Sequence, residues 1–404
     1  MRVLFAGTLV VAAAIGGSAQ AGDAFDNDAA PDPSPWLFGD WNGERTRLKD
    51  RGIDFQFGYT SEIAYNTSGG SRRDAAYADQ YVAGVTLDLE KLLGLQAAQF
   101  QATFTQRTGR NLVEDADLGT FQLVQEVYGR GQTTRLTQFW FHQQYLDGLL
   151  DWKIGRMGVG EDFASFACDF QNLTFCGSNP GNIVGDYIYN WPISQWGTRL
   201  KVNVEGFGYV QAGVYDLNPA YLGVSKALLP VWFSDSTGAL IPAEVGWLPT
   251  FNGLSGSYKV GGWYNTSEAD DVIDGTPGRG LYGAYINLEQ NLSERLKLFL
   301  NAVVADRRTS TIDAQAALGV VYTGLFDARP QDDVGLAIGT THMNDRVSDQ
   351  EGIEGSEYAA EVYYTWRPTP ALQVRPNLQY VYRPGGNDAN GDVFVLGLKT
   401  SANF

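Results

Sequence analysis

A row of polar side chains at alternate positions is the part of this sequence best suited to bind a solute. Side chains two residues apart lie on one face of an extended strand, so the row would line one wall. A guanidinium offers fixed hydrogen-bond donors, and a carboxylate such as that of Glu62 offers acceptors. Opposed charges cancel across a narrow space, which suits a neutral, hydroxyl-rich solute. The row consists of Gln99, Gln101, Thr103, Thr105 and Arg107.

Histidine chemistry is sparse in this chain. The only histidines are His142 and His342, and neither stands in a recognisable catalytic motif. A hydrolase of the lipase type needs a nucleophile and usually a histidine base. We therefore expect no catalytic site, no bound metal and no cofactor.

The N-terminus has the pattern of an export signal. A basic start, a brief apolar run and an Ala-x-Ala ending at residues 19–21 predict a secretory signal peptide over residues 1–21. The apolar run is too short to cross a bilayer as a helix, although an uncleaved anchor is the alternative. An exported chain meets an oxidising compartment, so Cys168 and Cys176 are expected to form a disulfide. Free or metal-bound cysteines are the weaker alternative.

Composition narrows the class of protein. The 404 residues carry 29 Lys and Arg against 46 Asp and Glu, and the net charge of -17 disfavours binding to nucleic acid. Aromatic residues make up 13% of the chain and charged residues only 19%, which excludes a disordered protein. No stretch after the signal is apolar enough for a transmembrane helix. The exported chain is therefore either soluble or a β-barrel.

Alternation of apolar and polar residues predicts long strands. Residues 53–65 separate cleanly by parity, and so do 356–367 and 371–383. A soluble sandwich also alternates. The strand lengths, the aromatic residues at strand ends and the alternating short and long connections favour a transmembrane antiparallel β-barrel with a water-filled lumen. About sixteen strands are expected, at residues 53–66, 77–90, 98–107, 135–145, 150–157, 195–205, 207–215, 245–251, 255–265, 280–289, 295–306, 311–323, 333–342, 356–367, 371–383 and 392–404.

The segment ahead of the first strand has a different pattern. Residues 22–52 read as a leader followed by a short periplasmic helix, with Asp40 able to cap its start and Gly52 able to end it. The barrel would then occupy residues 53–404.

Several segments form an ordered set of motifs along nearly the whole mature chain. They are Gly39-Asp40-Trp41-Asn42-Gly43-Glu44-Arg45, Lys49–Ile53, Gly155-Arg156, Gly160–Ser165, the cysteine pair, Gly213–Pro219, Glu361–Tyr364, Pro376–Tyr380 and Pro384–Asn387. This set resembles the OprB-type family of carbohydrate-selective porins of Gram-negative outer membranes. The resemblance implies a sixteen-stranded outer-membrane barrel that lets monosaccharides such as glucose diffuse passively into the periplasm.

The same resemblance implies roles for single residues. Arg107 would line the eyelet, the narrowest point of the pore, and Glu62 and Trp196 occupy similar eyelet places. Phe404 resembles the C-terminal signal read by the outer-membrane assembly machinery. Plainer roles are solvated wall charges for Arg107 and Glu62, and a lipid-facing position for Phe404. By parity Trp196 groups with Leu200, which predicts a lipid-facing residue unless the strand begins after it or bulges.

Several alternatives stay open at this point. A general or ion-selective diffusion porin would show the same alternation, and so would a soluble sugar-binding β-protein. Loop 158–194 could cover the rim, although we expect it to fold inward and narrow the channel. Acidic loops such as 67–76 could bind divalent cations at the lipopolysaccharide layer. Any lipid-facing strand could contact a second subunit, so monomer and trimer are both compatible with the pattern.

Overall fold

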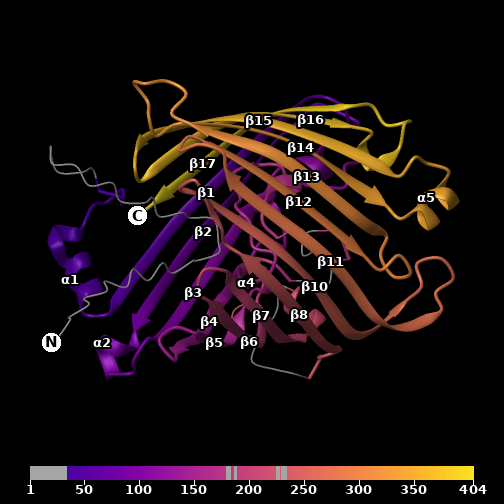
Figure 1. Ribbon diagram of the computed structural model, residues 1–404. Helices are drawn as coiled ribbons and strands as arrows, with labels where there is room; N and C mark the ends of the chain where they lie inside the picture. Colours follow the sequence, from indigo (N-terminus) through magenta and orange to yellow (C-terminus); the bar gives the residue numbers. More distant parts are fainter. Residues whose placement is uncertain (1–33, 179–182, 186–188, 224–227, 229–233) are drawn as a thin grey trace, which may run out of the picture.

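The protein is a closed antiparallel β-barrel (Figure 1). The computed structural model describes residues 34–178, 183–185, 189–223, 228 and 234–404. Each long strand pairs with the next along the chain, and β1 pairs with β17 to close the sheet. The strands are β1 (Ile53–Ser68), β2 (Ala75–Asp88), β3 (Ala98–Gly109), β4 (Thr134–Tyr145), β5 (Leu150–Met157), β6 (Gln195–Val204), β7 (Gly208–Leu217), β8 (Gly238–Trp247), the two-residue β9 (Thr250–Phe251), β10 (Leu254–Asp270), β11 (Pro277–Asn291), β12 (Leu296–Ala305), β13 (Ile312–Thr323), β14 (Asp333–Met343), β15 (Ser356–Thr369), β16 (Leu372–Tyr382) and β17 (Val393–Asn403).

The barrel is apolar outside and polar inside, the reverse of a soluble protein. In β1, Ile63 is 44% exposed and Tyr65 is 40% exposed, whereas Glu62, on the opposite parity, is fully buried. The same alternation runs through the other strands, where most of the exposed side chains at alternate positions are aromatic or aliphatic. A wall of this kind can face lipid with one side and water with the other. The prediction from sequence parity is confirmed.

The two ends of the barrel differ. Seven connections at one end, which we call the turn end, are short or carry only the helix α2 (Leu89–Leu93). The longest connections lie at the opposite loop end, where α5 (Asp345–Glu351) is found. In Figure 1 the turn end is on the left with α1, α2 and the C-terminus, and α5 is on the right. Within the described residues, no helix is both long enough and apolar enough to cross a membrane.

One predicted strand lies in a different place. The expected strand at 245–251 is instead β8, Gly238–Trp247. Pro242 lies in its middle, and a proline cannot donate a ladder hydrogen bond. The pairing of β8 with β7 is correspondingly interrupted between Ala243 and Leu240, while pairing with β10 continues through Pro242. A proline in the interior of a strand obscures its pattern, which explains the error.

The N-terminal segment packs against the end of the chain. The predicted helix is present as α1 (Glu44–Asp50), preceded by η1 (Trp41–Gly43). Gly43, with a φ of 88°, is its N-cap, while Asp40 Oδ1 accepts a hydrogen bond from the Thr46 amide at 2.9 Å. Arg45 donates to the carbonyl oxygens of Phe55 and Phe404. The expected signal peptide, residues 1–21, and most of the expected leader lie outside the described residues.

Candidate functional site

Two loops from the loop end fold into the barrel. They are the β3–β4 loop, residues 110–133, and the β5–β6 loop, residues 158–194, of which 158–178, 183–185 and 189–194 are described. Gln125 in the first loop donates to the carbonyl oxygen of Glu62 at 3.0 Å. The Asn172 side chain in the second loop donates to Gln379 of β16 at 3.0 Å. The β5–β6 loop therefore folds inward, as expected, and does not merely cover the rim.

The two inserted loops also bond to each other. The amide of Leu173 donates to the carbonyl oxygen of Leu123 at 2.9 Å, and the amide of Glu126 donates to the carbonyl oxygen of Gln171 at 3.1 Å. The β3–β4 loop contains α3 (Leu112–Asp115) and η2 (Glu126–Tyr128), and the β5–β6 loop contains α4 (Val159–Asp162) and η3 (Leu173–Phe175). Backbone bonds between loops from different hairpins make them one inserted body.

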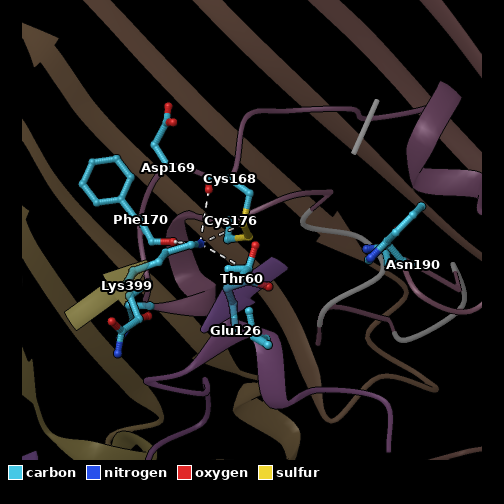
Figure 2. Close-up of a disulfide and its surroundings, with 12 residues drawn as sticks. Thr60, Glu126, Cys168, Asp169, Phe170, Cys176, Asn190 and Lys399 are labelled. Carbon is cyan, nitrogen blue, oxygen red and sulfur yellow. Dashed lines mark hydrogen bonds and ion pairs between the residues drawn. A yellow bond between two sulfur atoms is a disulfide. The ribbon is translucent and has the colours of Figure 1, made fainter. Parts of the chain in front are cut away.

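The predicted disulfide lies in this body. Cys168 and Cys176 are bonded, which confirms the pairing expected from export. Figure 2 shows the Lys399 ammonium group directed at the disulfide segment, with Glu126 on its other side. Lys399 Nζ lies 3.3 Å from the carbonyl oxygen of Cys168 and 3.0 Å from that of Phe170. A cation on the last strand thus holds the disulfide segment against the wall.

Four buried charges meet where the barrel closes, and we call them the charge cluster: Glu62, Arg107, Glu126 and Lys399. Glu62 of β1 and Lys399 of β17 are directly paired across the closing seam. Lys399 Nζ lies 3.4 Å from Glu62 Oε1 and 3.0 Å from Glu126 Oε1. Arg107 Nη2 lies 3.9 Å from Glu126 Oε2. Two carboxylates and two cations balance, which limits the cost of burying them.

Arg107 faces the lumen together with the polar row predicted in β3. Its Nε donates to Gln80 Oε1 at 2.9 Å and its Nη1 donates to the carbonyl oxygen of Gly129 at 2.6 Å. Nearer the turn end of β3, Gln101 donates to Thr103, and Thr103 donates to Gln138 of β4. The row therefore lines the inner wall with linked hydrogen-bonding groups.

An aromatic side chain does stand beside Arg107, but it is Trp191. Its indole N–H donates to Gln80 Oε1 at 2.9 Å, the same oxygen that accepts from Arg107. Trp196 lies in β6, which begins at Gln195 and pairs with β5 without a bulge from Gln195 to Val202. It shares the strand parity of Leu200, but its side chain is only partly exposed and packs against a buried apolar cluster that contains Met157.

Three members of this site escaped the sequence prediction. Lys399 had a signal, because it lies on the parity opposite to Leu396 and Leu398 in the last strand. Glu126 and Trp191 lie in loops, where no periodicity marks the residues that turn inward. Their positions depend on contacts with strands far away in the sequence.

The histidines lie beside carboxylates. His142 Nε2 is 3.0 Å from Asp151 on the inner wall, and His342 Nδ1 is 2.7 Å from Asp313 at the loop end. Among the described residues, the metal-ligand grouping that the geometry offers is Glu126 with Cys168 and Cys176. Both sulfurs are in the disulfide, so neither can supply a thiolate to a metal.

A second charged group lies where the β5–β6 loop enters the barrel. Glu161 in α4 accepts hydrogen bonds from Gln138 at 2.6 Å and from the Gly158 amide at 2.9 Å. Burial raises the pKa of the Glu161 carboxyl to about 7, and Lys153, 3.9 Å away, offsets this only in part. The neighbouring Asp162 has a lowered pKa despite its burial, because Lys153 lies 2.9 Å from it and Arg199 also contacts it.

Comparison with known proteins gives consistent matches. The family described as carbohydrate-selective porin, OprB family, matches residues 72–404. "Porin B" of Pseudomonas aeruginosa is 42% identical over 436 residues, which cover 96% of this chain and 95% of that protein. "Putative porin QuiX" of Acinetobacter baylyi is 33% identical over the full length of both. The high-pH structure of Pseudomonas putida OprB superposes with a TM-score of 0.89 at 41% identity, covering 93% of this chain and 100% of that chain.

Proposed function

The chain belongs to the OprB family of carbohydrate-selective porins, and from that premise we propose that the charge cluster is the point at which it selects sugars. A member of this family is a sugar-selective pore of the Gram-negative outer membrane. The family consists of channels. We propose monosaccharides such as glucose as its solutes and expect no catalytic activity.

The observation that carries this proposal is the balance of charge beside an aromatic ring. A sugar has hydroxyl groups around its rim and apolar C–H groups on its faces. Arg107 can donate to a hydroxyl oxygen, Glu126 can accept from a hydroxyl group, and the Trp191 ring can contact a C–H face. The buried Glu62 and Lys399 balance the charge and hold Glu126 in place. A cluster with no net charge favours neither anions nor cations. Binding must remain weak, because a tightly held solute would block the pore.

Liposome swelling with a panel of solutes tests the proposal. Protein reconstituted in liposomes should pass glucose faster than amino acids or organic anions of the same size, with a low single-channel ion conductance. Equal rates for all size-matched solutes would remove the selectivity and leave the rival reading, a general diffusion porin. A strong preference for one sign of ion would favour an ion-selective porin instead.

We also propose three features of the chain's biogenesis and surroundings. Residues 1–21 would direct export and be cleaved. Phe404 would be read by the assembly machinery before the barrel closes; in the folded chain its amide donates to the carbonyl oxygen of Phe57 at 2.9 Å. The outer wall would contact membrane lipid, the loop end would contact lipopolysaccharide, and a lipid-facing strand could contact a second subunit.

A further inference from the structure

The barrel wall holds the β5–β6 loop by its backbone. Carboxylates of the wall accept from loop amides, and cations of the wall donate to loop carbonyl oxygens. Buried backbone groups need such partners, and this segment has no strand or helix to supply them. From Ala164 to Asn172 the partners are Glu244 for the Ala164 amide, Lys259 for the Ser165 carbonyl, Lys399 for the Cys168 and Phe170 carbonyls, Arg375 for the Asp169 carbonyl, and Glu361 for the Gln171 and Asn172 amides.

Three wall glutamates, Glu244, Glu357 and Glu361, form no ion pair with a cation among the described residues. Glu244 accepts from the Ala164 amide at 2.8 Å and from the hydroxyl groups of Tyr209 and Tyr285. Glu357 accepts from the Phe121 amide in the β3–β4 loop at 2.7 Å. All three are almost completely buried. An unpaired buried carboxylate is costly, so its hydrogen bonds to the loops must compensate.

Glu361 has the most demanding geometry of the three. Its Oε1 accepts from the Gln171 amide at 2.9 Å, and its Oε2 accepts from the Asn172 amide at 2.7 Å. Two consecutive N–H groups are thus held by two different oxygens. In Glu357, by contrast, the amides of Phe121 and Gly385 both donate to the single oxygen Oε2.

We propose that Glu244, Glu357 and Glu361 are positioning residues that set the width of the pore, because they hold the inserted loops in place by their backbone amides. This inference rests on the proposed function, because it takes the inserted loops as the constriction of the pore. The glutamates have a different role from the charge cluster, since they hold the loops and do not touch the sugar. The charge cluster selects the solute, and the glutamates fix the space in which it does so.

The test compares E361Q with E357Q. A glutamine keeps one accepting oxygen and replaces the other with an NH2 donor. In E361Q the new NH2 group would face the amide N–H of Gln171 or Asn172. That amide would lose its acceptor, and the two donors would repel each other. In E357Q the one remaining oxygen can still accept from both amides. The two variants remove the same charge from the same strand and differ in accepting geometry and in the loop that each carboxylate holds.

Two measurements on the full mature protein report the outcome. We expect a higher and noisier single-channel ion conductance in E361Q than in the wild type, and a smaller increase in E357Q, which keeps an oxygen that can accept from Phe121 and Gly385. Hydrogen exchange at residues 171–176 should accelerate roughly ten- to a hundredfold in E361Q alone, as expected for loss of a hydrogen bond to a charged group. Equal behaviour of the two variants, whether both unchanged or both altered, would overturn the proposal.

A second pair of variants tests the same hydrogen bond from the loop side. Asn172 has a φ of -72°, which proline can adopt, so N172P deletes the amide donor without touching the barrel wall. N172A removes the same side chain and keeps the amide. A higher conductance in N172P than in N172A supports the proposal even if E361Q fails to insert, and equal conductances contradict it. Ion conductance is measured without sugar, so these results stand apart from the swelling assay.

Discussion

At the scale of single residues, the lumen uses its charges in two different ways. Glu62 and Lys399 face each other across the closing seam and balance, while Glu361 is devoted to the backbone of a loop. Parity alone places Glu62 and Arg107 on the inner wall. It does not say which inward charge meets a solute and which meets a loop, because that depends on the path of the loop.

Arg107→Ala should weaken the preference for sugars and leave the barrel folded. The side chain supplies charged hydrogen-bond donors at the proposed site, and loss of one such interaction costs about 1.5–3 kcal/mol at most when fully formed. Because the sugar is held weakly, we expect a fall in glucose preference of roughly two- to tenfold, measured by liposome swelling. Arg110→Ala removes the same charge from an exposed position and is the control. Retained selectivity in Arg107→Ala would exclude it from the site.

Lys399→Met should destabilise the protein strongly. The change leaves the buried carboxylates of Glu62 and Glu126 without their closest cation, and breaking a buried ion pair costs about 3–5 kcal/mol. The expected result is a lower temperature of unfolding in a heat-modifiable gel mobility assay. Lys49→Met breaks an exposed pair with Asp54 and should change little. Similar shifts for both variants would show that Lys399 has no special role in the cluster.

At the scale of elements, strands follow from the sequence and inserted loops do not. The strand at 150–157 was predicted to the residue, because a half-buried strand repeats every two positions. β8 was misplaced because Pro242 interrupts its pattern. The β3–β4 loop has no repeat at all, and its inward path rests on contacts such as that of Gln125 with the backbone of Glu62. The inserted body could therefore not be derived from local sequence.

Replacing both Cys168 and Cys176 with serine should loosen the inserted loop without opening the barrel. The disulfide closes a short segment with a sequence separation of 8, and its loss costs roughly 2–3 kcal/mol in the chain-entropy account. We expect faster proteolysis within residues 163–178 and a higher ion conductance, while the folded barrel keeps its gel mobility. Loss of the folded gel species would contradict this assignment, since the sheet itself contains no disulfide among its described strands.

Glu161 at the entry of the β5–β6 loop predicts a dependence of stability on pH. Its pKa rises from the ordinary value of 4.5 to about 7 because burial disfavours the carboxylate. The folded state thus binds a proton more tightly than the unfolded state, so the stabilising contribution is complete below pH 4.5 and is lost as pH rises to 7. Thermal unfolding of the wild type relative to Glu161→Gln should show this decline across that interval. A constant difference between the two proteins would contradict it.

At the scale of the whole molecule, the outer and inner surfaces set each other's composition. An apolar outer parity leaves the inner parity free to carry charge, and the inserted loops form hydrogen bonds with that polar interior. The family resemblance visible in the sequence already implied this architecture, and the comparisons agree with it. The general form of the channel was therefore predictable, whereas Glu126 and Trp191 of the proposed site lie in loops whose path the sequence does not show.

The β1–β17 pairing makes the proposed selective point a product of the first and last strands of the barrel. Glu62 comes from the first strand and Lys399 from the last, and they meet only when the sheet has closed. A barrel lacking its final strand would expose the unpaired backbone N–H and C=O groups of a strand edge to hydrocarbon, where they have no hydrogen-bond partner. Closure of the barrel and assembly of the proposed sugar-selective site are consequently one event, so every closed barrel already brings Glu62 and Lys399 together.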